Sequence, residues 1–168
     1  MRLRRATLAD AAKLAAVGAA GFLESFADDH PGDDLIAHLE AHHTPTAYRA
    51  ALNDPTLSLW IVEEALGAPV GYAMMGDSTL PFTTARDAEL KRIYMLSRWH
   101  GGGWGGALLT AVVTEARARG AERLALAVYT NNPKAIAFYE AKGFQLLGPT
   151  QFQVGATVFE DLVMAKPL

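Results

Sequence analysis

A cluster of glycines in the second half of the chain is the first feature whose spacing could do chemistry. The six positions from Gly101 to Gly106 hold five of the 15 glycines, and apolar residues recur at helical spacing directly after them. Before them, alternating residues predict a strand from Ala88 to Leu96. A strand, a glycine turn and a helix in this order expose backbone amides at a helix N-terminus, where the peptide dipoles favour negative charge. The segment therefore predicts a phosphate-binding loop.

Three phosphate-bearing ligands are candidates for this loop. A nucleoside triphosphate site requires Lys followed by Ser or Thr after the last glycine, and Ala107 and Leu108 stand there instead. A dinucleotide site is disfavoured because its glycines follow the first strand of a fold, whereas this loop follows the fourth predicted strand. The pyrophosphate of coenzyme A remains. The alternative without a ligand is a turn that only lets the strand and the helix pack closely.

Turn residues and periodicity predict the elements that position the loop. A short strand precedes the first helix, which Thr7 and Asp10 begin as a capping box. Asn132 and Pro133 form the cap and first turn of a later helix, which ends at Gly143. In chain order the prediction is a helix at 8–26, a hairpin of two strands within 57–76, a loop at 77–87, the central strand, a helix that stops at 120, a strand at 124–128, the helix after the cap, and closing strands at 144–147 and 158–164.

Length and composition limit the class of protein. The chain has 168 residues, of which 51% are hydrophobic, and this suits one domain spanning 1–168. Its 15 basic and 18 acidic residues give a net charge of −3, which argues against a nucleic-acid-binding protein. Without cysteine there is no disulfide, thiolate metal site or cysteine nucleophile. Since no apolar run is long enough to span a membrane, we expect a cytoplasmic protein with neither nucleic-acid nor membrane partners.

The segment from Leu14 to Tyr48 has an unusual charge pattern. It contains no lysine or arginine, but it holds six carboxylates and four of the five histidines. It is either a solvated helical face with a turn at 30–32 or a surface that attracts cations. Among the histidines, only His38 and His42 have the spacing of a helical ligand pair, and they lack a third partner. We therefore expect no metal site.

Two ordered motifs resemble the GNAT superfamily of N-acetyltransferases. The stretch from Glu89 to Leu109 looks like its motif A, in which Arg/Gln-x-x-Gly-x-Gly/Ala follows the fourth strand. His100, Gly103 and Gly105 stand at the pattern positions. A second stretch resembles motif B through Asn132, Ala135, Phe138, Tyr139, Gly143 and Phe144. The likeness covers nearly all of the chain. Because His100 replaces the Arg or Gln, phosphate contacts would depend more on backbone amides, and on a neighbouring arginine, Arg98, if that side chain turns inward.

The resemblance implies a single-domain α/β fold with a mixed, mostly antiparallel seven-stranded sheet, splayed between strands 4 and 5, and about four helices. It implies acetyl-coenzyme A as co-substrate, with the pantetheine arm paired with backbone groups of the central strand inside the splay. It also implies a homodimer. Two cofactor residues have a structural alternative, Asn132 as a helix cap and Trp104 as a residue buried against the sheet. The implied cofactor-binding residues are Ile93, Met95, Leu96, His100, Gly101, Gly102, Gly103, Trp104, Gly105, Gly106, Asn132 and Tyr139.

Tyr139 and Glu89 are the catalytic candidates that the resemblance assigns. Tyr139 matches the tyrosine beside the cofactor sulfur, and a phenol with a pKa of about 10 can return a proton to a thiolate with a pKa of about 8.5. Its alternative is an aromatic core residue. Glu89 matches a strand-four glutamate that acts as the base in some members, and its alternative is a surface carboxylate paired with a neighbouring basic residue. On a straight strand the odd-numbered residues from Glu89 to Met95 share one face. The Cα atoms of Glu89 and Ile93 would be about 13 Å apart, so a water relay or a bulge is required.

These features predict the transfer of an acetyl group to a small primary amine. The stretch from Glu89 to Tyr94 and the ending around Val154, Gly155 and Asp161 are similar to the bacterial spermidine/spermine acetyltransferase branch. The acidic segment falls where relatives form the acceptor wall, and its carboxylates would attract a polyamine. A polyamine is therefore the expected acceptor. The alternative function is a non-catalytic acyl-coenzyme A sensor or interaction module with the same fold.

Overall fold

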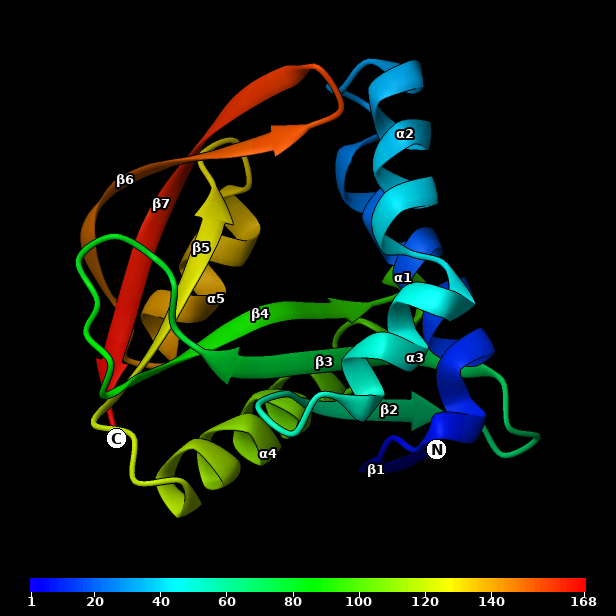
Figure 1. The fold of residues 1–168 in the computed structure, drawn as a ribbon, viewed down its shortest axis with the longest axis horizontal. Helices are drawn as coiled ribbons and strands as arrows, with labels where there is room; N and C mark the ends of the chain where they lie inside the picture. The colour runs from blue at the N-terminus through cyan, green and yellow to red at the C-terminus, as the bar shows by residue number, and fades with distance from the viewer.

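The strands form one seven-stranded sheet in the order β1-β2-β3-β4-β5-β7-β6, in a computed structural model that describes residues 1–168. All neighbouring strands are antiparallel except β4 and β5, which are parallel. This confirms the predicted mixed sheet (Figure 1). The strands are β1 (Arg2–Arg5), β2 (Ser58–Glu63), β3 (Pro69–Asp77), β4 (Asp87–Met95), β5 (Arg123–Tyr129), β6 (Gln145–Val154) and β7 (Thr157–Pro167).

Five α-helices accompany the sheet, where the sequence predicts about four. The additional helix begins at the end of the acidic segment, where Thr44 accepts a hydrogen bond from the amide of Ala47 at 3.1 Å and Pro45 occupies the first turn. No helix combines the length and the apolar composition that a bilayer crossing requires. The helices are α1 (Ala11–Phe26), α2 (Gly32–His42), α3 (Pro45–Asn53), α4 (Trp104–Ala118) and α5 (Pro133–Ala141), with short 3₁₀ turns η1 (Leu8–Asp10) and η2 (Ser97–Trp99).

Apolar side chains cover both faces of the sheet. On one face Leu108 and Val112 of α4 belong to the same buried cluster as Met75 of β3. On the other face Leu14 of α1 belongs to a second cluster with Tyr72 of β3. Successive side chains of a strand point to opposite faces, so β3 contributes to both clusters. Each fully buried side chain of this size stabilises the fold by about 1.5–3 kcal/mol.

The N-terminal strand is fixed to the first helix by a charged clamp. Both terminal nitrogens of Arg4 donate to the Asp10 carboxylate at 2.7 Å, and Arg4 Nε donates to Glu63 at 2.8 Å. The amide of Thr7 donates to Asp10 at 2.8 Å, which confirms the predicted capping box. The Arg4 guanidinium and the Thr7 amide together hold the pKa of Asp10 far below its ordinary value.

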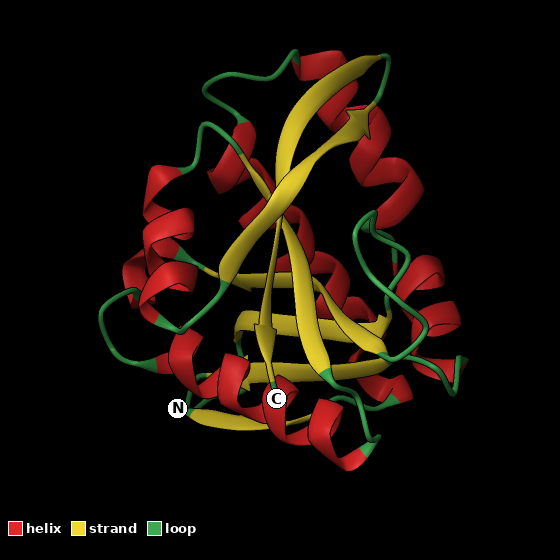
Figure 2. Ribbon diagram, turned by 90° about the vertical axis from the view of Figure 1, so that its left-hand side faces the viewer, coloured by secondary structure: helices red, strands yellow, loops and turns green.

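The sheet opens between its two parallel strands. β4 and β5 pair at only three positions, from Asp87 opposite Arg123 to Glu89 opposite Ala125, and both strands continue beyond them. Figure 1 shows β4 running across the molecule while β5 rises away from it. Figure 2 shows the same division, with one group of strands crossing beneath a second group that stands steeply over it. The predicted splay is therefore confirmed.

A bulge in β4 inverts its side-chain alternation. Arg92 lies opposite Met74 and Leu90 lies opposite Met75, so Lys91 is an extra residue without a partner in β3. The expectation that Glu89 and Ile93 share a face is wrong, because straight-strand alternation takes no account of the extra residue.

The inverted alternation gives the two halves of β4 different neighbours. Leu90 packs in the same cluster as Ile93 and Met95, on the face that α4 covers. Glu89 turns to the opposite face, where it lines a cavity with Phe22 of α1. The bulge therefore places the predicted base on one side of the sheet and the predicted arm-binding residues on the other.

The hairpin of β6 and β7 reaches over to α2. Asp34 accepts hydrogen bonds from the amide of Ala156 at 2.8 Å and from the hydroxyl of Thr157 at 2.5 Å. Gly155 has φ +57, and a Cβ at this position would collide with Asp34. Figure 1 shows the tip of the hairpin beside α2, above the opening in the sheet. These contacts therefore hold the tip of the hairpin against the first turn of α2.

Candidate active site

The glycine loop has the geometry of an anion cradle. Gly101 and Gly103 both have φ +80, and Gly103 is the N-cap of α4. The first helical hydrogen bond runs from the amide of Ala107 to the carbonyl of Gly103, and none of the amides from Gly101 to Gly106 donates within the protein. A Cβ at Gly101, Gly103 or Gly105 would meet no atom within 4 Å, so the space in front of these amides is open.

A cavity of about 470 Å³ lies in front of this loop. It is bounded by β4, the N-terminus of α4 and the first turns of α5, and its volume is that of a small-molecule site. Most residues assigned to the cofactor line it, but Leu96 and Gly102 do not. The lining residues are Ile93, Met95, Trp99, His100, Gly101, Gly103, Trp104, Gly105, Gly106, Asn132, Lys134, Ala135, Phe138 and Tyr139.

The backbone of β4 offers hydrogen-bonding groups to this cavity. The amide of Leu96 donates to the carbonyl of Val70 in β3 at 2.9 Å. Because alternate residues of an antiparallel strand face the partner strand, the backbone groups of Ile93 and Met95 point away from β3, into the opening. The carbonyl of Leu96 accepts from the amide of Trp99 at 2.9 Å. Both backbone groups of Leu96 are thus already paired, and Leu96 offers none to a ligand.

The imidazole of His100 is turned toward β4. Its Nε2 donates to the carbonyl of Met95 at 2.7 Å, and Nζ of Lys134 lies 3.5 Å from its Nδ1. Arg98, the other cation considered for phosphate, lies over the ring of Trp99 at 5.6 Å from its centroid. His100 therefore pairs with the end of β4 while it lines the cavity, and Arg98 packs on Trp99.

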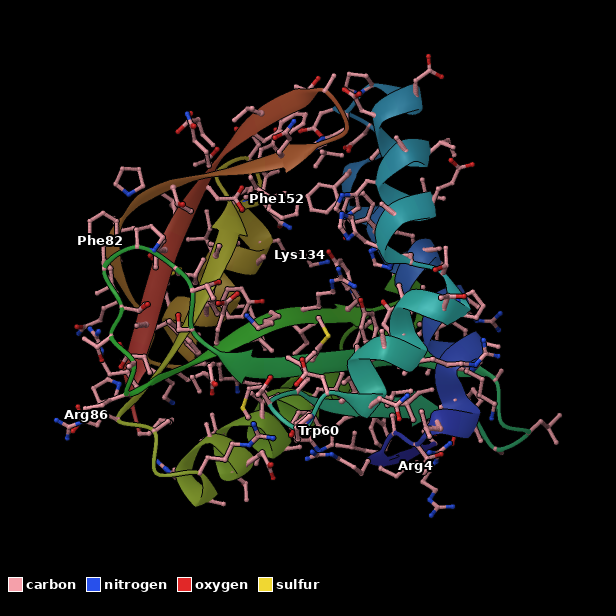
Figure 3. All side chains as sticks on the ribbon, viewed as in Figure 1. Arg4, Trp60, Phe82, Arg86, Lys134 and Phe152 are labelled. Atoms are coloured by element: carbon pink, nitrogen blue, oxygen red, sulfur yellow. The ribbon has the colours of Figure 1, made fainter.

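Lys134 is the cation that sequence reasoning missed. It stands in the first turn of α5 and lines the cavity. Figure 3 shows it in the space between β5 and β4. The available signal was its position, because a basic residue in the first turn of a helix opposes the helix dipole and suggests a nearby anion.

Asn132 and Trp104 each combine the two alternatives considered for them. The side-chain oxygen of Asn132 accepts from the amide of Ala135 at 3.0 Å, so it caps α5 as predicted, while its amide nitrogen has no partner in the protein and the residue lines the cavity. Trp104 packs against the apolar cluster under α4 and also lines the cavity. Gly102 does not line the cavity, and a side chain at this position would face the Trp104 ring.

The hydroxyl of Tyr139 is buried and unpaired. The residue is 8% exposed, and its hydroxyl makes no hydrogen bond with the protein. Every fully enclosed polar side-chain atom in the structure has a hydrogen-bond partner. The unpaired hydroxyl of Tyr139 is therefore not fully enclosed, and it faces the first cavity, which the residue lines. Burial, with a smaller contribution from Tyr94, raises the pKa of Tyr139 well above its ordinary value. The phenol is therefore held in its protonated form, as a proton donor must be.

A second cavity lies on the far side of the splay. It has a volume of about 170 Å³ and is bounded by α1, β4, β5 and the hairpin of β6 and β7. A connecting cavity of about 130 Å³ shares Ile93 and Tyr139 with the first cavity, and Tyr94 and Tyr129 with the second. The second cavity is lined by Phe22, Phe26, His30, Leu80, Glu89, Leu90, Lys91, Tyr94, Ala127, Tyr129, Phe152, Phe159 and Asp161.

Glu89 is the predicted base and lines the second cavity. Its side chain is 12% exposed. One carboxylate oxygen accepts from the amide of Thr79 at 2.9 Å and from Lys91 at 3.2 Å. Glu89 is therefore paired with a neighbouring basic residue, Lys91, and also lines a cavity, so both alternatives considered for it occur. Only its second carboxylate oxygen is free.

Asp161 is a second carboxylate in this cavity. It is 7% exposed and accepts no hydrogen bond from the protein. Burial, with a smaller contribution from Glu160, raises its pKa from 3.8 to about 6. Sequence reasoning treated Asp161 only as part of a similar ending. A carboxylate between apolar neighbours of a closing strand was the signal that could have identified it.

The acidic segment lines the cavity with rings and not with carboxylates. Phe22, Phe26 and His30 face the cavity, whereas none of the six carboxylates does. Two of those carboxylates have structural roles, since Glu24 accepts from the amide of Ser97 at 2.8 Å and another holds the hairpin. The segment therefore lines the second cavity, with rings in place of the expected carboxylates.

The histidines of this segment belong to an aromatic cluster. His38 stacks on Phe22 with ring centroids 4.3 Å apart, and Phe152, labelled in Figure 3, packs edge-on against His38. Burial lowers the pKa of His38 to about 4 and that of His43 to about 3. No three His, Asp or Glu side chains come together in the arrangement of a metal site.

Comparison with known proteins places this geometry in a family. Residues 20–144 match the Acetyltransferase (GNAT) family. The chain is 32% identical over 163 residues to an uncharacterized N-acetyltransferase of Mycobacterium tuberculosis (strain ATCC 25618 / H37Rv), covering 96% of this chain and 99% of that protein. It is 31% identical over 88 residues to an L-methionine sulfoximine/L-methionine sulfone acetyltransferase of Pseudomonas aeruginosa, covering 52% of this chain and 51% of that protein.

The fold is also that of a solved N-acetyltransferase. The PaiA N-acetyltransferase of Thermoplasma acidophilum, solved in complex with coenzyme A, superposes with a TM-score of 0.81 at 16% identity. The match covers 99% of this chain and 98% of that chain. The chain therefore belongs to the acetyltransferase (GNAT) family of N-acetyltransferases.

Proposed function

We propose that this protein transfers the acetyl group of acetyl-coenzyme A to a small primary amine. The observation that carries the proposal is the pair of cavities that meet at the splay beside Tyr139. One cavity presents phosphate-binding amides, and the other presents carboxylates for an amine. A direct transfer requires that two substrates approach one point from opposite sides, and this arrangement provides it.

The first cavity fits acetyl-coenzyme A. The unpaired amides from Gly101 to Gly106 and the ammonium group of Lys134 would hold the pyrophosphate. The backbone groups of Ile93, the amide of Met95 and the free amide nitrogen of Asn132 would hold the pantetheine arm, because the carbonyl of Met95 already accepts from His100. The coenzyme A bound to the Thermoplasma acidophilum relative of the same fold supports this assignment.

Acetyl-coenzyme A supplies the thioester that a neutral amine attacks. The role of this chain is to aim the two substrates and to move protons. The protonated phenol of Tyr139, held without a protein partner, would give its proton to the departing sulfur. The free oxygen of Glu89 is available to an amine or to a water molecule in the second cavity.

The acceptor is a primary amine, and a polyamine is the class of amine expected from the sequence. Glu89 and Asp161 in the second cavity support a cationic acceptor. The carboxylates of the acidic segment give no further support because none of them lines the cavity. The relative from Pseudomonas aeruginosa acts on amino-acid derivatives, which provides a second class for comparison.

The test is a steady-state assay of thiol release from acetyl-coenzyme A with monoamines, polyamines and amino acids. The proposal expects turnover with at least one primary amine and none with the matching tertiary amine. Binding of acetyl-coenzyme A without turnover on any acceptor would favour the sensor alternative. The homodimer stays a proposal, and light scattering of the purified protein tests it.

A further inference from the structure

Asp161 is a buried carboxylate for which the protein provides no partner. Its 7% exposure is low enough that an ionised carboxylate pays a desolvation cost, yet no protein group donates a hydrogen bond to it. Because every fully enclosed polar side-chain atom in the structure has a partner, the unpaired carboxylate of Asp161 is not fully enclosed. It faces the second cavity, which the residue lines. A buried acceptor without a donor is the arrangement expected of a group whose partner is a ligand.

Aromatic rings line the same cavity as this carboxylate. His30 stacks on Phe159 with centroids 3.6 Å apart, and Tyr129 packs edge-on against both rings at 5.3 and 5.8 Å. Phe26 lies 5.9 Å from Tyr129. These four residues, Phe26, His30, Tyr129 and Phe159, are called the aromatic box below. Aromatic rings attract a cation, and they exclude the water that would otherwise solvate it.

We propose that Asp161 binds the ammonium group of the acceptor and takes its proton, and that the acceptor is a primary monoamine with an apolar body and no carboxylate. The inference rests on the proposed function, and it names the substrate class and a further catalytic residue for it. The aromatic box and four more apolar residues of the same cavity, Phe22, Leu80, Ala127 and Phe152, account for the apolar body.

The second cavity offers no free cation for a substrate carboxylate. Lys91 is paired with Glu89 at 3.2 Å, and Nδ1 of His30 lies 2.6 Å from Asp29. Arg92 lines only the connecting cavity, and its guanidinium is directed to the carbonyl of His42 at 3.4 Å. An amino acid would therefore bury an unpaired carboxylate, which is costly.

The charges of the second cavity also disfavour a polyamine, because the cavity has too few free carboxylates for a second ammonium group. Apart from Asp161, the only carboxylate in the cavity is Glu89, which already serves Lys91 and the amide of Thr79. A second ammonium group of the substrate would lie among rings without a counter-ion.

The proton transfer balances. The acceptor ammonium gives one proton to Asp161, which becomes a neutral acid, and the amine nitrogen gains the lone pair it needs for attack. When the N–C bond forms and the C–S bond breaks, Tyr139 gives its proton to the departing sulfur, and the second proton that nitrogen loses restores the phenol of Tyr139. Asp161 then returns its proton to solvent, so one proton is released for each acetyl group transferred.

The raised pKa of Asp161 suits this role, because a base is most effective when its pKa is near the working pH. The proposal predicts that kcat/KM of the parent protein falls as the pH drops through about 6, where Asp161 becomes protonated. The other titratable groups that face Asp161 or line its cavity are Tyr94 and the Glu89–Lys91 pair of β4, Tyr129 of β5, Glu160 of β7, and His30 with Asp29 at the end of α1.

The experiment compares the parent protein with Asp161→Asn and Glu160→Gln. Glu160→Gln is the matched control, since Glu160 is the adjacent, exposed carboxylate and hydrogen-bonds to Gln151 at 2.9 Å. The first acceptor probe is 2-phenylethylamine. L-Phenylalanine differs from it by a carboxylate, and spermidine is a polyamine with additional positive charges. Circular dichroism and the thermal shift with acetyl-coenzyme A report whether each variant is folded.

We expect Asp161→Asn to lose about 100-fold or more in kcat/KM for 2-phenylethylamine, and the control to stay within about threefold. Calorimetry without acetyl-coenzyme A should show 2-phenylethylamine binding to the parent and not to Asp161→Asn. The inference is overturned if Asp161→Asn keeps its turnover, or if the parent prefers L-phenylalanine or spermidine. If Asp161→Asn does not fold, the loss of parent activity through about pH 6 decides, and a flat profile there overturns the inference.

Failure of the proposed function gives a different result. In that case the parent releases no thiol with any amine, whatever the state of Asp161. Asp161-dependent binding of 2-phenylethylamine without turnover would support the binding role of Asp161 and refute the transferase activity of the chain.

Discussion

The imidazole Nε2 of His100 donates a 2.7 Å hydrogen bond to the carbonyl of Met95. The residue that the family resemblance places among the phosphate contacts is thus used to fix the end of β4. The carbonyl of Met95 faces the opening in the sheet, so His100 occupies one of the backbone groups that the pantetheine arm was expected to use. Lys134 is then the only lysine or arginine that lines the first cavity.

Lys134→Gln should weaken acetyl-coenzyme A binding about 10- to 100-fold, because a charge-assisted contact to phosphate contributes about 1.5–3 kcal/mol. His100→Ala should change the dissociation constant by less than about threefold. Calorimetric titration measures both values, and Arg117→Gln, at the far end of α4, is the control. A larger effect of His100→Ala than of Lys134→Gln would show that the assignment of the phosphate contact is incorrect.

Tyr139→Phe should reduce kcat about 100-fold and leave the affinity for acetyl-coenzyme A within about twofold. The hydroxyl has no partner in the protein, so its removal leaves no buried group unsatisfied and the fold should keep its stability. Steady-state kinetics and thermal unfolding make the comparison. An unchanged kcat would exclude Tyr139 as the proton donor.

Gly103→Ala should weaken acetyl-coenzyme A binding about tenfold. Its φ of +80 would force a side chain into the left-handed region at a cost of about 1–2 kcal/mol and would disturb the amides that follow it. Gly120→Ala is a matched control, since Gly120 has φ +78 and open space around it, but it follows the opposite end of α4. Urea unfolding should show similar destabilisation in both variants. If both variants also lost the same affinity, the loop geometry would not be the cause.

Asp161→Asn should be more stable than the parent near neutral pH. The folded-state pKa of Asp161 is raised from 3.8 to about 6, so its contribution to stability is complete below about pH 3.8 and is lost as the pH rises through 6. At high pH the parent carries a buried charge that Asn does not, and the difference should be about 2–3 kcal/mol. Urea unfolding of both proteins at pH 4 and pH 8 measures it. Equal stability at both pH values would contradict the buried position of this carboxylate.

Asp10→Asn should destabilise the protein by about 2 kcal/mol at neutral pH, because it removes charge-assisted hydrogen bonds to Arg4 from a side chain that is 6% exposed. The pKa of Asp10 is depressed, so its contribution is present above the ordinary value of 3.8 and is lost as the pH falls below that value. The parent and the variant should therefore converge in acid. Urea unfolding across this range is the measurement, and a difference that persists in acid would point to packing instead.

Local signals made much of this structure predictable. The cap at Asn132, the capping box at Thr7 and Asp10, and the glycines before α4 act through residues close in sequence, and each lies where the sequence places it. The family resemblance added the splay, which no local pattern contains.

Features that depend on residues distant in sequence could not be located from the sequence, although a bulge is one of the two arrangements considered for Glu89. The bulge at Lys91 arises from the register with β3, and it moved Glu89 to the opposite face. The pairing of Leu96 with Val70 depends on the same register. The unpaired state of Asp161 becomes visible only when α1, β4, β5 and the β6–β7 hairpin come together around it.

The short parallel contact between β4 and β5 has a consequence for the life of the protein in a cell. Three residue pairs join the two halves of the sheet at one end, and a bound donor would bridge the rest. A ligand that binds only the folded state lowers the population of open forms that proteases attack. Ample acetyl-coenzyme A would therefore protect this enzyme from degradation, and its abundance would follow the metabolic supply of its own donor.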